Sequence, residues 1–247
     1  DFPSYFVCFT YPNIVEVSEK DIRRVTEGVS AIEIRVDQWE SQEISFVKHQ
    51  ISFLRCQSNL PLIFTVRTIP QGGKFPVDDK KLFELYELAL RMGIDFIDVE
   101  QSWSAPLKNK IFQAVERQEI HGSRCTQVIV SEHFYVPKNH RNEILHLFRL
   151  CEEQGLADIV KVVIRANTID DVFTLQSVCQ EYSSQTSKKF IALATTQNGQ
   201  LSRVLNSFLC PVTHPLLPIA AAPGQLTVQE INQARNLIGK NTFPTTE

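Results

Sequence analysis

Eight short apolar runs recur along the chain, and they are rich in valine, isoleucine and phenylalanine. They occupy residues 5–10, 31–37, 60–68, 96–102, 126–133, 158–166, 188–196 and 208–214. Each run is close to continuously apolar, which is typical of parallel strands that are buried on both faces of a sheet. The pattern therefore predicts eight buried parallel strands.

The stretches between these runs repeat apolar residues at helical spacing. In residues 77–93 the predicted apolar face consists of Leu82, Leu85, Tyr86, Ala89 and Leu90. Gly93 follows this face, and glycine is a common residue at helix ends because it readily adopts a left-handed backbone. Residues 139–155 repeat the pattern up to Gly155, whereas residues 197–207 leave room for only a short helix.

Eight strands that alternate with helices in 247 residues match the α/β architecture of a (β/α)8 TIM barrel. No low-complexity linker or shift in composition divides the chain, so a single domain is predicted over residues 1–247. A doubly wound open sheet is the alternative. No G-x-G-x-x-G follows the first strand, so the usual signature of a dinucleotide-binding open sheet is absent.

Charge and cysteine content narrow the function classes. The net charge of −3 gives no general attraction to nucleic acid or anionic membrane, and no apolar run approaches the roughly 20 residues of a membrane span. The N-terminus lacks the basic segment of a signal peptide. We expect reduced, mostly buried thiols in a cytoplasmic protein and no metal site, because no CxxC pair or ligand spacing occurs among Cys8, Cys56, Cys125, Cys151, Cys179, Cys210 and the histidines.

Polar residues gather at the C-terminal ends of the predicted strands, which is where barrel enzymes place their active sites. In chain order these residues are Glu33, Arg35, Asp37, Arg67, Asp98, Glu100, His133, Lys161, Arg203 and Gln225. Taken singly, each has a structural explanation, such as a salt-bridge cluster lining the barrel or a histidine that only packs. Their joint position at one end of the predicted barrel favours a site, because random placement would scatter them over both ends.

Lys161 lies inside the apolar run 158–166, and its sequence context allows two interpretations. Its stem can run along apolar surface and carry the ammonium to water. Alternatively, burial favours the free amine, which attacks a carbonyl to form a Schiff base. With a histidine to move protons and arginines to bind an anion, the second interpretation predicts an imine-forming lyase or aldolase acting on a small anionic ketone.

Several motifs together resemble the type I 3-dehydroquinate dehydratases, and most closely the dehydroquinase domain of fungal pentafunctional AROM proteins. They are "AIEIRVD", "FTVRT" followed by "QGGKFP", "LALRMG" with "DVE", "VSEH", "ADIVKVV", "GQLSRVLN", "PVTHP" and "AAPGQLTVQEI". These segments span nearly the whole chain in the order of the family. The resemblance implies a TIM barrel that removes water from 3-dehydroquinate to give 3-dehydroshikimate without a cofactor.

The resemblance also implies roles for individual residues. Lys161 corresponds to the Schiff-base lysine, His133 to the general acid/base, and Asp98 to the acidic residue that orients the histidine. The remaining expected residues bind substrate: Glu33, Arg35 and Arg67 around the hydroxyls, Arg203 at the carboxylate, and Gln225 on a closing loop. Cys8 stands where a small residue ends the first strand.

The chain departs from the family pattern at a few positions. Phe134 follows the catalytic histidine where the family usually has aspartate. Thr195 and Thr196 replace a fungal Met-Gly pair, which removes a methionine expected to pack on the substrate or the lysine. Ala221 stands where many bacterial members have serine. These changes bear on turnover and keep a second hypothesis open, that of a metabolite-sensing domain like the one in fungal quinate-pathway repressors. A sensor would not need both Lys161 and His133, and an aldolase would not explain "EIRVD" and "APGQ".

The expected partner is the small molecule 3-dehydroquinate, and neither nucleic acid nor a membrane is expected. A homodimer remains open, as do neighbouring shikimate-pathway domains in the same polypeptide. The helix-like stretch 227–247 is compatible with a natural end or with a continuation into another domain.

Overall fold

Eight parallel strands form a nearly closed ring in the computed structural model, which describes residues 4–120, 123–135 and 140–238. The strands are β1 (Tyr5–Phe9), β2 (Ala31–Arg35), β3 (Leu62–Thr65), β4 (Phe96–Glu100), β7 (Gln127–Phe134), β8 (Ile159–Arg165), β9 (Lys189–Thr195) and β10 (Cys210–Val212). Their spatial order is β10-β1-β2-β3-β4-β7-β8-β9, with every neighbouring pair parallel. The predicted TIM-type barrel is confirmed, and the open-sheet alternative is wrong.

All eight predicted strands are present, but most are shorter than the apolar runs. The reason is visible after β2 and β3, where the chain leaves the sheet and turns into the short 3-10 helices η2 (Val36–Gln38) and η3 (Ile69–Gln71). Asp37 lies in η2, and Arg67 and Thr68 lie between β3 and η3. Candidate site residues therefore lie both in the last residues of the strands and in the loops that follow them.

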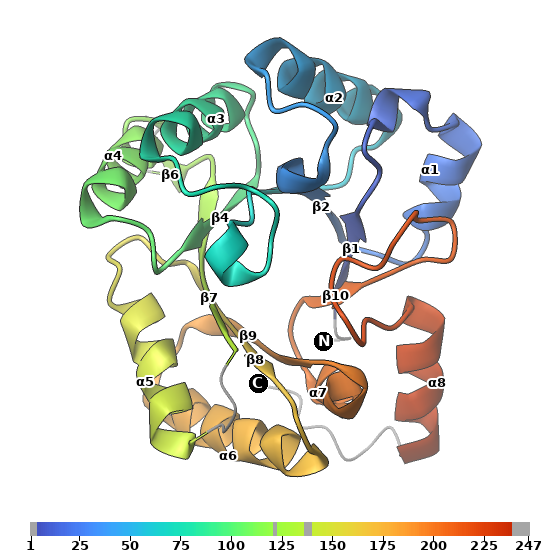
Figure 1. Cartoon of the computed structure of the whole chain (residues 1–247), viewed down its shortest axis with the longest axis vertical. Helices are drawn as coiled ribbons and strands as arrows, with labels where there is room; N and C mark the ends of the chain where they lie inside the picture. Colours follow the sequence, from blue (N-terminus) through green and yellow to red (C-terminus); the bar gives the residue numbers. More distant parts are fainter. Residues whose placement is uncertain (1–3, 121–122, 136–139, 239–247) are drawn as a thin grey trace.

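Helices surround the strand ring, as Figure 1 shows in a view along the barrel. They are α1 (Glu19–Val25), α2 (Ile44–Gln57), α3 (Asp79–Arg91), α4 (Ala105–Glu116), α5 (Arg141–Glu152), α6 (Ile169–Gln185), α7 (Gln200–Leu205) and α8 (Val228–Ile238). Further 3-10 turns are η1 (Ile14–Glu16) and η4 (Gln197–Gly199), and a small antiparallel hairpin pairs β5 (Glu119–Ile120) with β6 (Ser123–Arg124).

Side-chain caps fix where several helices begin. Ser18, Asp78 and Ser104 each accept a hydrogen bond from a backbone N–H in the first turn of α1, α3 and α4. Thr168 and Asp171 form a reciprocal capping box at α6. Each cap satisfies amide groups that the helix itself leaves without partners.

The helices bury the apolar faces that the sequence predicts. All five residues of the predicted α3 face are buried against the strands. The predicted helix 139–155 is observed as α5, although its first residue lies outside the described part of the chain. The short helix after the seventh strand is α7, and α8 covers the described part of the helix-like stretch near the C-terminus. The main core therefore lies between the strand ring and its helices.

Two glycines let loops pack closely over the C-terminal ends of the strands. A Cβ at Gly73 would lie 2.0 Å from the carbonyl oxygen of Arg67, and one at Gly224 would lie 2.1 Å from that of Thr196. Thr196 itself has a φ of 77°, which is unusual for a β-branched residue. Its N–H donates to Pro223 at 3.1 Å and its hydroxyl donates to Ala166 at 2.6 Å. These bonds hold a threonine where the fungal relatives are expected to have glycine.

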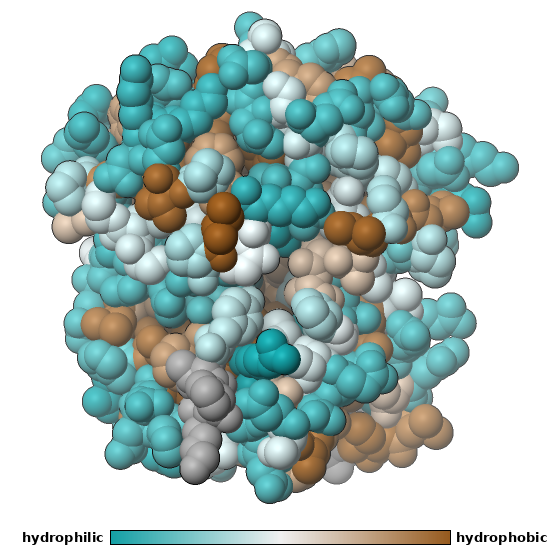
Figure 2. Space-filling view, in the orientation of Figure 1, coloured by the Kyte–Doolittle hydropathy of each residue, from teal (hydrophilic) through white to brown (hydrophobic). Residues whose placement is uncertain are grey.

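The expectation of mostly buried cysteines holds only in part. Cys8, Cys151 and Cys210 are buried, but Cys56 and Cys125 are exposed because they lie outside the apolar faces of their segments. The face of the molecule in Figure 2 is mainly hydrophilic with scattered apolar side chains. Among the described helices, none is long and apolar enough to cross a membrane.

Candidate active site

A cleft with about 430 Å³ of empty space, partly open to solvent, lies at the C-terminal ends of the strands. Seven of the eight predicted site residues line it: Glu33, Arg35, Arg67, His133, Lys161, Arg203 and Gln225. The eighth, Asp98, lies directly beneath the lining and contacts it through hydrogen bonds. The structure thus brings together residues from β2, β4, β7, β8 and α7 with residues from the loops after β3 and before α8.

Lys161 points from the middle of β8 toward the barrel axis and is 5% exposed. Its Nζ donates to Asp98 Oδ2 at 2.9 Å and lies 3.5 Å from Glu33 Oε1. The ammonium also lies 5.8 Å from the centre of the Phe6 ring. The side chain is therefore held inside the barrel, and the alternative of a stem that carries its charge to bulk water is wrong.

Asp98 ties the lysine to an arginine. Its carboxylate accepts from Lys161, from Arg67 Nη2 at 2.8 Å and from Ser131 Oγ at 2.6 Å. Burial on its own would raise the pKa of Asp98, but the positive charges of Arg67 and Lys161 hold that pKa well below its usual value. Asp98 is therefore a fixed negative charge beneath the cleft.

Arg67 is positioned by a second carboxylate. Its Nη1 donates to Glu100 Oε1 at 3.0 Å and to Ser131 Oγ at 2.9 Å. Glu100 is in turn held by the Thr68 amide at 2.9 Å, the Thr68 hydroxyl and Trp103 Nε1 at 2.8 Å. Burial would lower the pKa of Arg67, yet the neighbouring carboxylates raise it. The guanidinium is a permanent cation with its direction fixed.

Arg35 and Glu33 share the inward face of β2. Arg35 donates to both oxygens of Asp37, at 2.8 and 2.9 Å, in a buried bidentate pair. Glu33 accepts from Thr65 Oγ1 at 2.9 Å. Burial would raise the pKa of Glu33, but Lys161 and Arg35 lower it. The alternation of β2 thus presents one anion and one cation side by side to the cleft.

His133 contacts Gln71 rather than the residue expected to orient it. The ring Nδ1 lies 3.3 Å from Gln71 Oε1, and the same oxygen accepts the backbone N–H of His133 at 2.6 Å. The hydrogen bonds of Asp98 go instead to Arg67, Ser131 and Lys161. The expectation that Asp98 orients the histidine is therefore not what the geometry gives. Asp98 carries its charge below the site, and the loop after β3 supplies the contact to the ring.

The protonation of His133 follows from its surroundings. Burial lowers the pKa of the ring, and the positive charges of Arg67 and Lys161 lower it further, although Asp98 opposes them. The net result is a pKa well below the usual value for histidine. The imidazole is therefore neutral near pH 7, and a neutral imidazole can accept a proton.

Among the cations that line the cleft, Arg203 has no carboxylate partner in the part of the chain that the structure describes. The side chain is 1% exposed, its Nη1 donates to the Pro211 carbonyl at 3.2 Å, and its Nε has no hydrogen-bond partner among the described residues. No ion pair to Arg203 occurs within the described residues. Burial lowers its pKa. An uncompensated buried cation at the edge of a cleft is suited to bind an anionic ligand.

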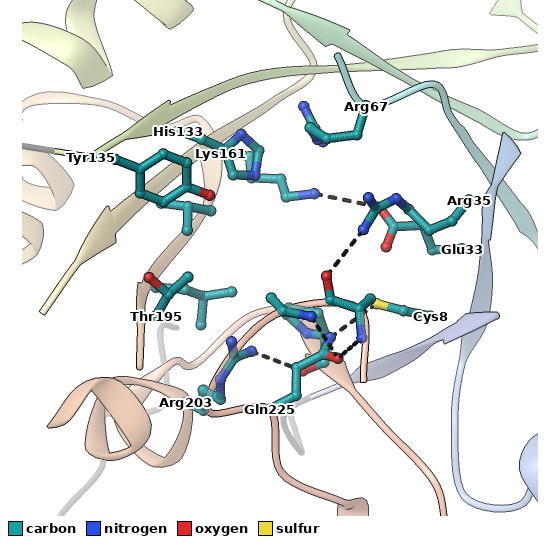
Figure 3. A pocket seen from close by; sticks show the side chains of 15 residues that line it. Cys8, Glu33, Arg35, Arg67, His133, Tyr135, Lys161, Thr195, Arg203 and Gln225 are labelled. Atoms are coloured by element: carbon teal, nitrogen blue, oxygen red, sulfur yellow. Dashed lines mark hydrogen bonds and ion pairs between the residues drawn. The ribbon is translucent and has the colours of Figure 1, made fainter. Parts of the chain in front are cut away.

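Gln225 lies in the loop between β10 and α8. Its Oε1 accepts from the Ala221 amide at 2.8 Å and the Ala222 amide at 3.4 Å, and its Nε2 donates to Cys8 Sγ at 3.2 Å. The carbonyl of Ala221 lies 3.4 Å from Arg35 Nη1. The loop thereby connects the first two strands across the cleft, as the dashed lines in Figure 3 indicate.

Several lining residues were not predicted from the sequence as site residues. They are Tyr135, Val163, Leu193, Thr195, Pro211, Ala221 and Ala222, together with Gln71 behind the histidine. The signal for Gln71 was present, since "QGG" directly follows the Arg67 segment and the two glycines permit a tight return of the chain. Tyr135 carried no such signal, because only the course of the chain beyond β7 brings its ring to 6.2 Å from that of His133.

The arrangement combines a buried primary amine, a neutral imidazole and an uncompensated cation around one cleft. Together these groups can form an imine, transfer a proton and hold an anion. Within the described residues, no group of three or more histidine, cysteine, aspartate or glutamate side chains is placed to hold a metal ion.

Comparison with known proteins assigns the chain to a family. A model of the type I 3-dehydroquinase family matches residues 5–242. The chain belongs to this family. The pentafunctional AROM polypeptides of Lachancea thermotolerans and Schizosaccharomyces pombe are each 40% identical to it over 96% of its length. The chain spans only 14% and 15% of the length of these two relatives.

Solved structures of dehydroquinases have the same fold. The structure titled dehydroquinate dehydratase and shikimate dehydrogenase from S. pombe AroM is 38% identical, with a TM-score of 0.85 over 97% of this chain and 45% of that chain. A type I 3-dehydroquinate dehydratase from Clostridium difficile is 24% identical, with a TM-score of 0.83 over 97% of this chain and 93% of that chain. The second likeness concerns the barrel fold alone.

Proposed function

We propose that this dehydroquinase-family domain converts 3-dehydroquinate to 3-dehydroshikimate and water through a Schiff base on Lys161. The single observation that carries the proposal is the position of the unpaired Arg203 across the cleft from Lys161 and His133. A small anionic ketone fits this arrangement, because its carboxylate can pair with the guanidinium while its carbonyl meets the amine. Membership of the family supports the choice of substrate.

The first half of the reaction uses Lys161. Its Nζ leaves the ion pair with Asp98 as a free amine and adds to the ketone carbon, and loss of the carbonyl oxygen as water gives an iminium. Two carboxylates near Nζ, from Asp98 and Glu33, stabilise the positive charge of this iminium. The iminium withdraws electrons from the neighbouring carbon and acidifies its C–H bond.

The second half uses His133. The neutral imidazole takes the proton from the acidified carbon, and the bond electrons pass into an enamine. The enamine then expels the hydroxyl group on the next carbon, which leaves as water after His133 returns the proton. Water finally adds to the conjugated iminium and releases the enone product with free Lys161. Over one turnover the substrate loses one water molecule, and the protein returns to its starting state.

The other lining groups bind and orient the substrate in this proposal. Arg203 pairs with the carboxylate, while Glu33, Arg35 and Arg67 surround the hydroxyl groups. The side chains of Glu33, Arg35 and Arg67 are each already held by a hydrogen-bond partner, such as Asp37, which accepts from Arg35 at 2.8 Å. Groups that are fixed before binding lose little freedom when substrate arrives, which favours orientation. Gln225 completes the wall from the loop before α8.

An enzyme is favoured over a sensor because Lys161 and His133 face one cleft, and because the relatives bear the names of enzymes. The length of those relatives also supports neighbouring shikimate-pathway domains in the same polypeptide as part of the proposal. An immunoblot of native extract with an antibody to this domain would test that part. A band near 28.2 kDa would refute it.

The decisive test mixes the protein with 3-dehydroquinate and follows the ultraviolet absorbance of the conjugated enone. Addition of borohydride during turnover should attach a ligand-sized mass to Lys161, because the reagent reduces a Schiff base to a stable amine. The Lys161→Met variant, in which no amine is available, should show neither the absorbance nor the label. Turnover without a label at Lys161 would refute the mechanism, and a folded wild-type protein without turnover would refute the function.

A further inference from the structure

A chain of hydrogen bonds runs outward from His133 to a partly buried carboxylate, that of Glu132, which the proposed mechanism does not use. Gln71 Oε1 accepts the backbone N–H of His133 at 2.6 Å and faces the ring Nδ1 at 3.3 Å. The Nε2 of the same amide donates to Glu132 Oε1 at 2.8 Å. Glu132 precedes His133 in β7, so its side chain points to the opposite face of the strand.

Both ends of the Gln71 amide have fixed requirements. The backbone N–H of His133 can only donate, so it requires the amide oxygen. An ionised Glu132 can only accept, so it requires the amide nitrogen. A rotated amide would break both bonds at once. Glu132 and the backbone N–H of His133 therefore together determine which atom of Gln71 faces the imidazole ring.

The orientation of Gln71 in turn selects the tautomer of the imidazole. An amide oxygen only accepts, so the nitrogen that faces it, Nδ1, is the one that carries the ring proton. The lone pair then resides on Nε2. Only this tautomer has Nε2 free to take a proton from a ligand while the ring remains held by the loop.

The surroundings of Glu132 act against its charge, but they leave Oε1 an acceptor in either protonation state, because a proton would sit on the unpartnered Oε2. Its Oε2 is buried and has no hydrogen-bond partner among the described residues. Burial raises its pKa, although the bond from Gln71 opposes this effect. Other ionisable groups close enough to act on it, or on which it acts, are Glu100, Arg67, Lys108 and Cys151. The helix α5 packs against β7, and among the described residues the carboxylate of Glu132 accepts a hydrogen bond from Gln71.

We propose that Glu132 is a positioning residue for His133, acting through Gln71 to hold the ring as the Nδ1–H tautomer. The proposal rests on the assignment of His133 as the acid/base of the proposed function, but the tautomer itself is a property of the resting protein. It can therefore be measured without substrate. Glu132 does not touch the reacting atoms, and its removal should alter the catalytic step more than binding.

The test uses nitrogen-15 NMR of histidine-labelled protein, with the His133 signals identified by their loss in His133→Ala. The wild type should show a proton on Nδ1 and a lone pair on Nε2. Glu132→Leu should shift the ring toward a mixture of tautomers and lower kcat by at least about tenfold, because misplaced catalytic groups commonly cost one to two orders of magnitude. KM should stay within about twofold, since the groups that bind substrate are intact.

An exchanged pair makes the test specific. Gln71→Glu alone would place two carboxylates 2.8 Å apart, so it should be strongly impaired. Adding Glu132→Gln restores a donor opposite each acceptor. The new amide at position 132 can donate to the new carboxylate at position 71, and that carboxylate still accepts from His133. The double variant should recover the Nδ1–H signal and most of the kcat lost in Gln71→Glu. Failure of this rescue would overturn the proposal.

Glu152→Leu provides the matched control. Glu152 is also a partly buried glutamate, and it accepts from Tyr182 at 2.9 Å and Thr186 at 2.6 Å, far from the cleft in the α5–α6 region. Its loss should lower stability without changing the ring signals or kcat. An unchanged tautomer in Glu132→Leu would overturn the role of Glu132 whatever the activity. A wild-type protein with the predicted tautomer and no turnover would instead refute the proposed function alone.

Discussion

Replacement of Arg203 by methionine should weaken substrate binding while leaving stability nearly unchanged. Methionine has a similar length and an apolar end, so it fills much of the same space without the charge. In the free protein Arg203 is 1% exposed, and within the described residues its guanidinium makes one hydrogen bond, to Pro211 at 3.2 Å. The residue therefore contributes little to folding, and its main interaction partner is expected to be the substrate carboxylate.

The expected size of both effects follows from this geometry. Loss of a buried charge-assisted pair costs about 2–4 kcal/mol, which corresponds to a rise in KM of about 30- to 700-fold. Removal of a buried unpaired cation stabilises the free protein, and loss of its hydrogen bond to Pro211 opposes that gain by a similar amount. The free energy of unfolding should then change by less than about 1 kcal/mol, and Tm by less than about 4 °C.

Initial rates from the enone absorbance give KM, and thermal unfolding without substrate gives Tm. Arg55→Met is the control, because Arg55 pairs with Asp95 at 2.6 Å and donates to Gly93 at 3.0 Å near the N-terminal ends of β3 and β4. It should lose up to about 1 kcal/mol of stability, as is common for partly exposed ion pairs, with KM unchanged. If Arg203→Met behaved like this control, Arg203 would be a structural arginine and the assignment of the carboxylate site would be wrong.

Three further outcomes are expected. His133→Ala should lower kcat by at least about a hundredfold with little change in substrate binding. The imine at Lys161 should accumulate in this variant, and its reduced form should be visible by intact-mass measurement after borohydride treatment. Burial and nearby cations lower the pKa of His133 in the folded protein. Its imidazole should therefore remain unprotonated, and kcat/KM should not fall through its protonation, until the pH is below about 6.5. The pKa of His133 is lower in the folded protein than in the unfolded chain. Its contribution to the free energy of unfolding is therefore complete above about pH 6.5 and declines as the pH falls. A pH-stability curve for His133→Asn that kept this decline would contradict the reasoning. Thr196→Val should lose about 1 kcal/mol in denaturant unfolding through the missing bond to Ala166, whereas Thr196→Gly should be tolerated at its φ of 77°.

The barrel and most of its lining could be predicted because both depend on short-range pattern. Parallel strands that are buried on both faces give continuous apolar runs. A polar side chain within such a run is therefore expected to point into the barrel interior. Lys161 is the clearest example, since its neighbours in β8 are aliphatic and buried. Its position opposite Ser131 in β7 follows from the strand pairing.

The partners of these residues could not be predicted, because they depend on how neighbouring strands are staggered and how loops return. Asp98 in β4 lies level with Thr65 in β3 and with Ile129 in β7, which directs its carboxylate at Arg67 and Lys161. The contact of Gln71 with His133 needs the chain after β3 to fold back until Gly73 meets the carbonyl of Arg67. No local spacing in the sequence encodes either distance.

The order of the sheet has a consequence for how this domain can evolve. β9 and β10 are the two ends of the strand order, and α7 lies in the chain between them. Arg203 therefore belongs to a segment outside the hydrogen-bonded ladder, whereas Lys161 and His133 are set in paired strands. Mutations in residues 197–206 can change which anionic group is accepted without altering the register of the barrel. A library of variants confined to that segment would test other acidic ketones as substrates while Lys161 and His133 stay unchanged.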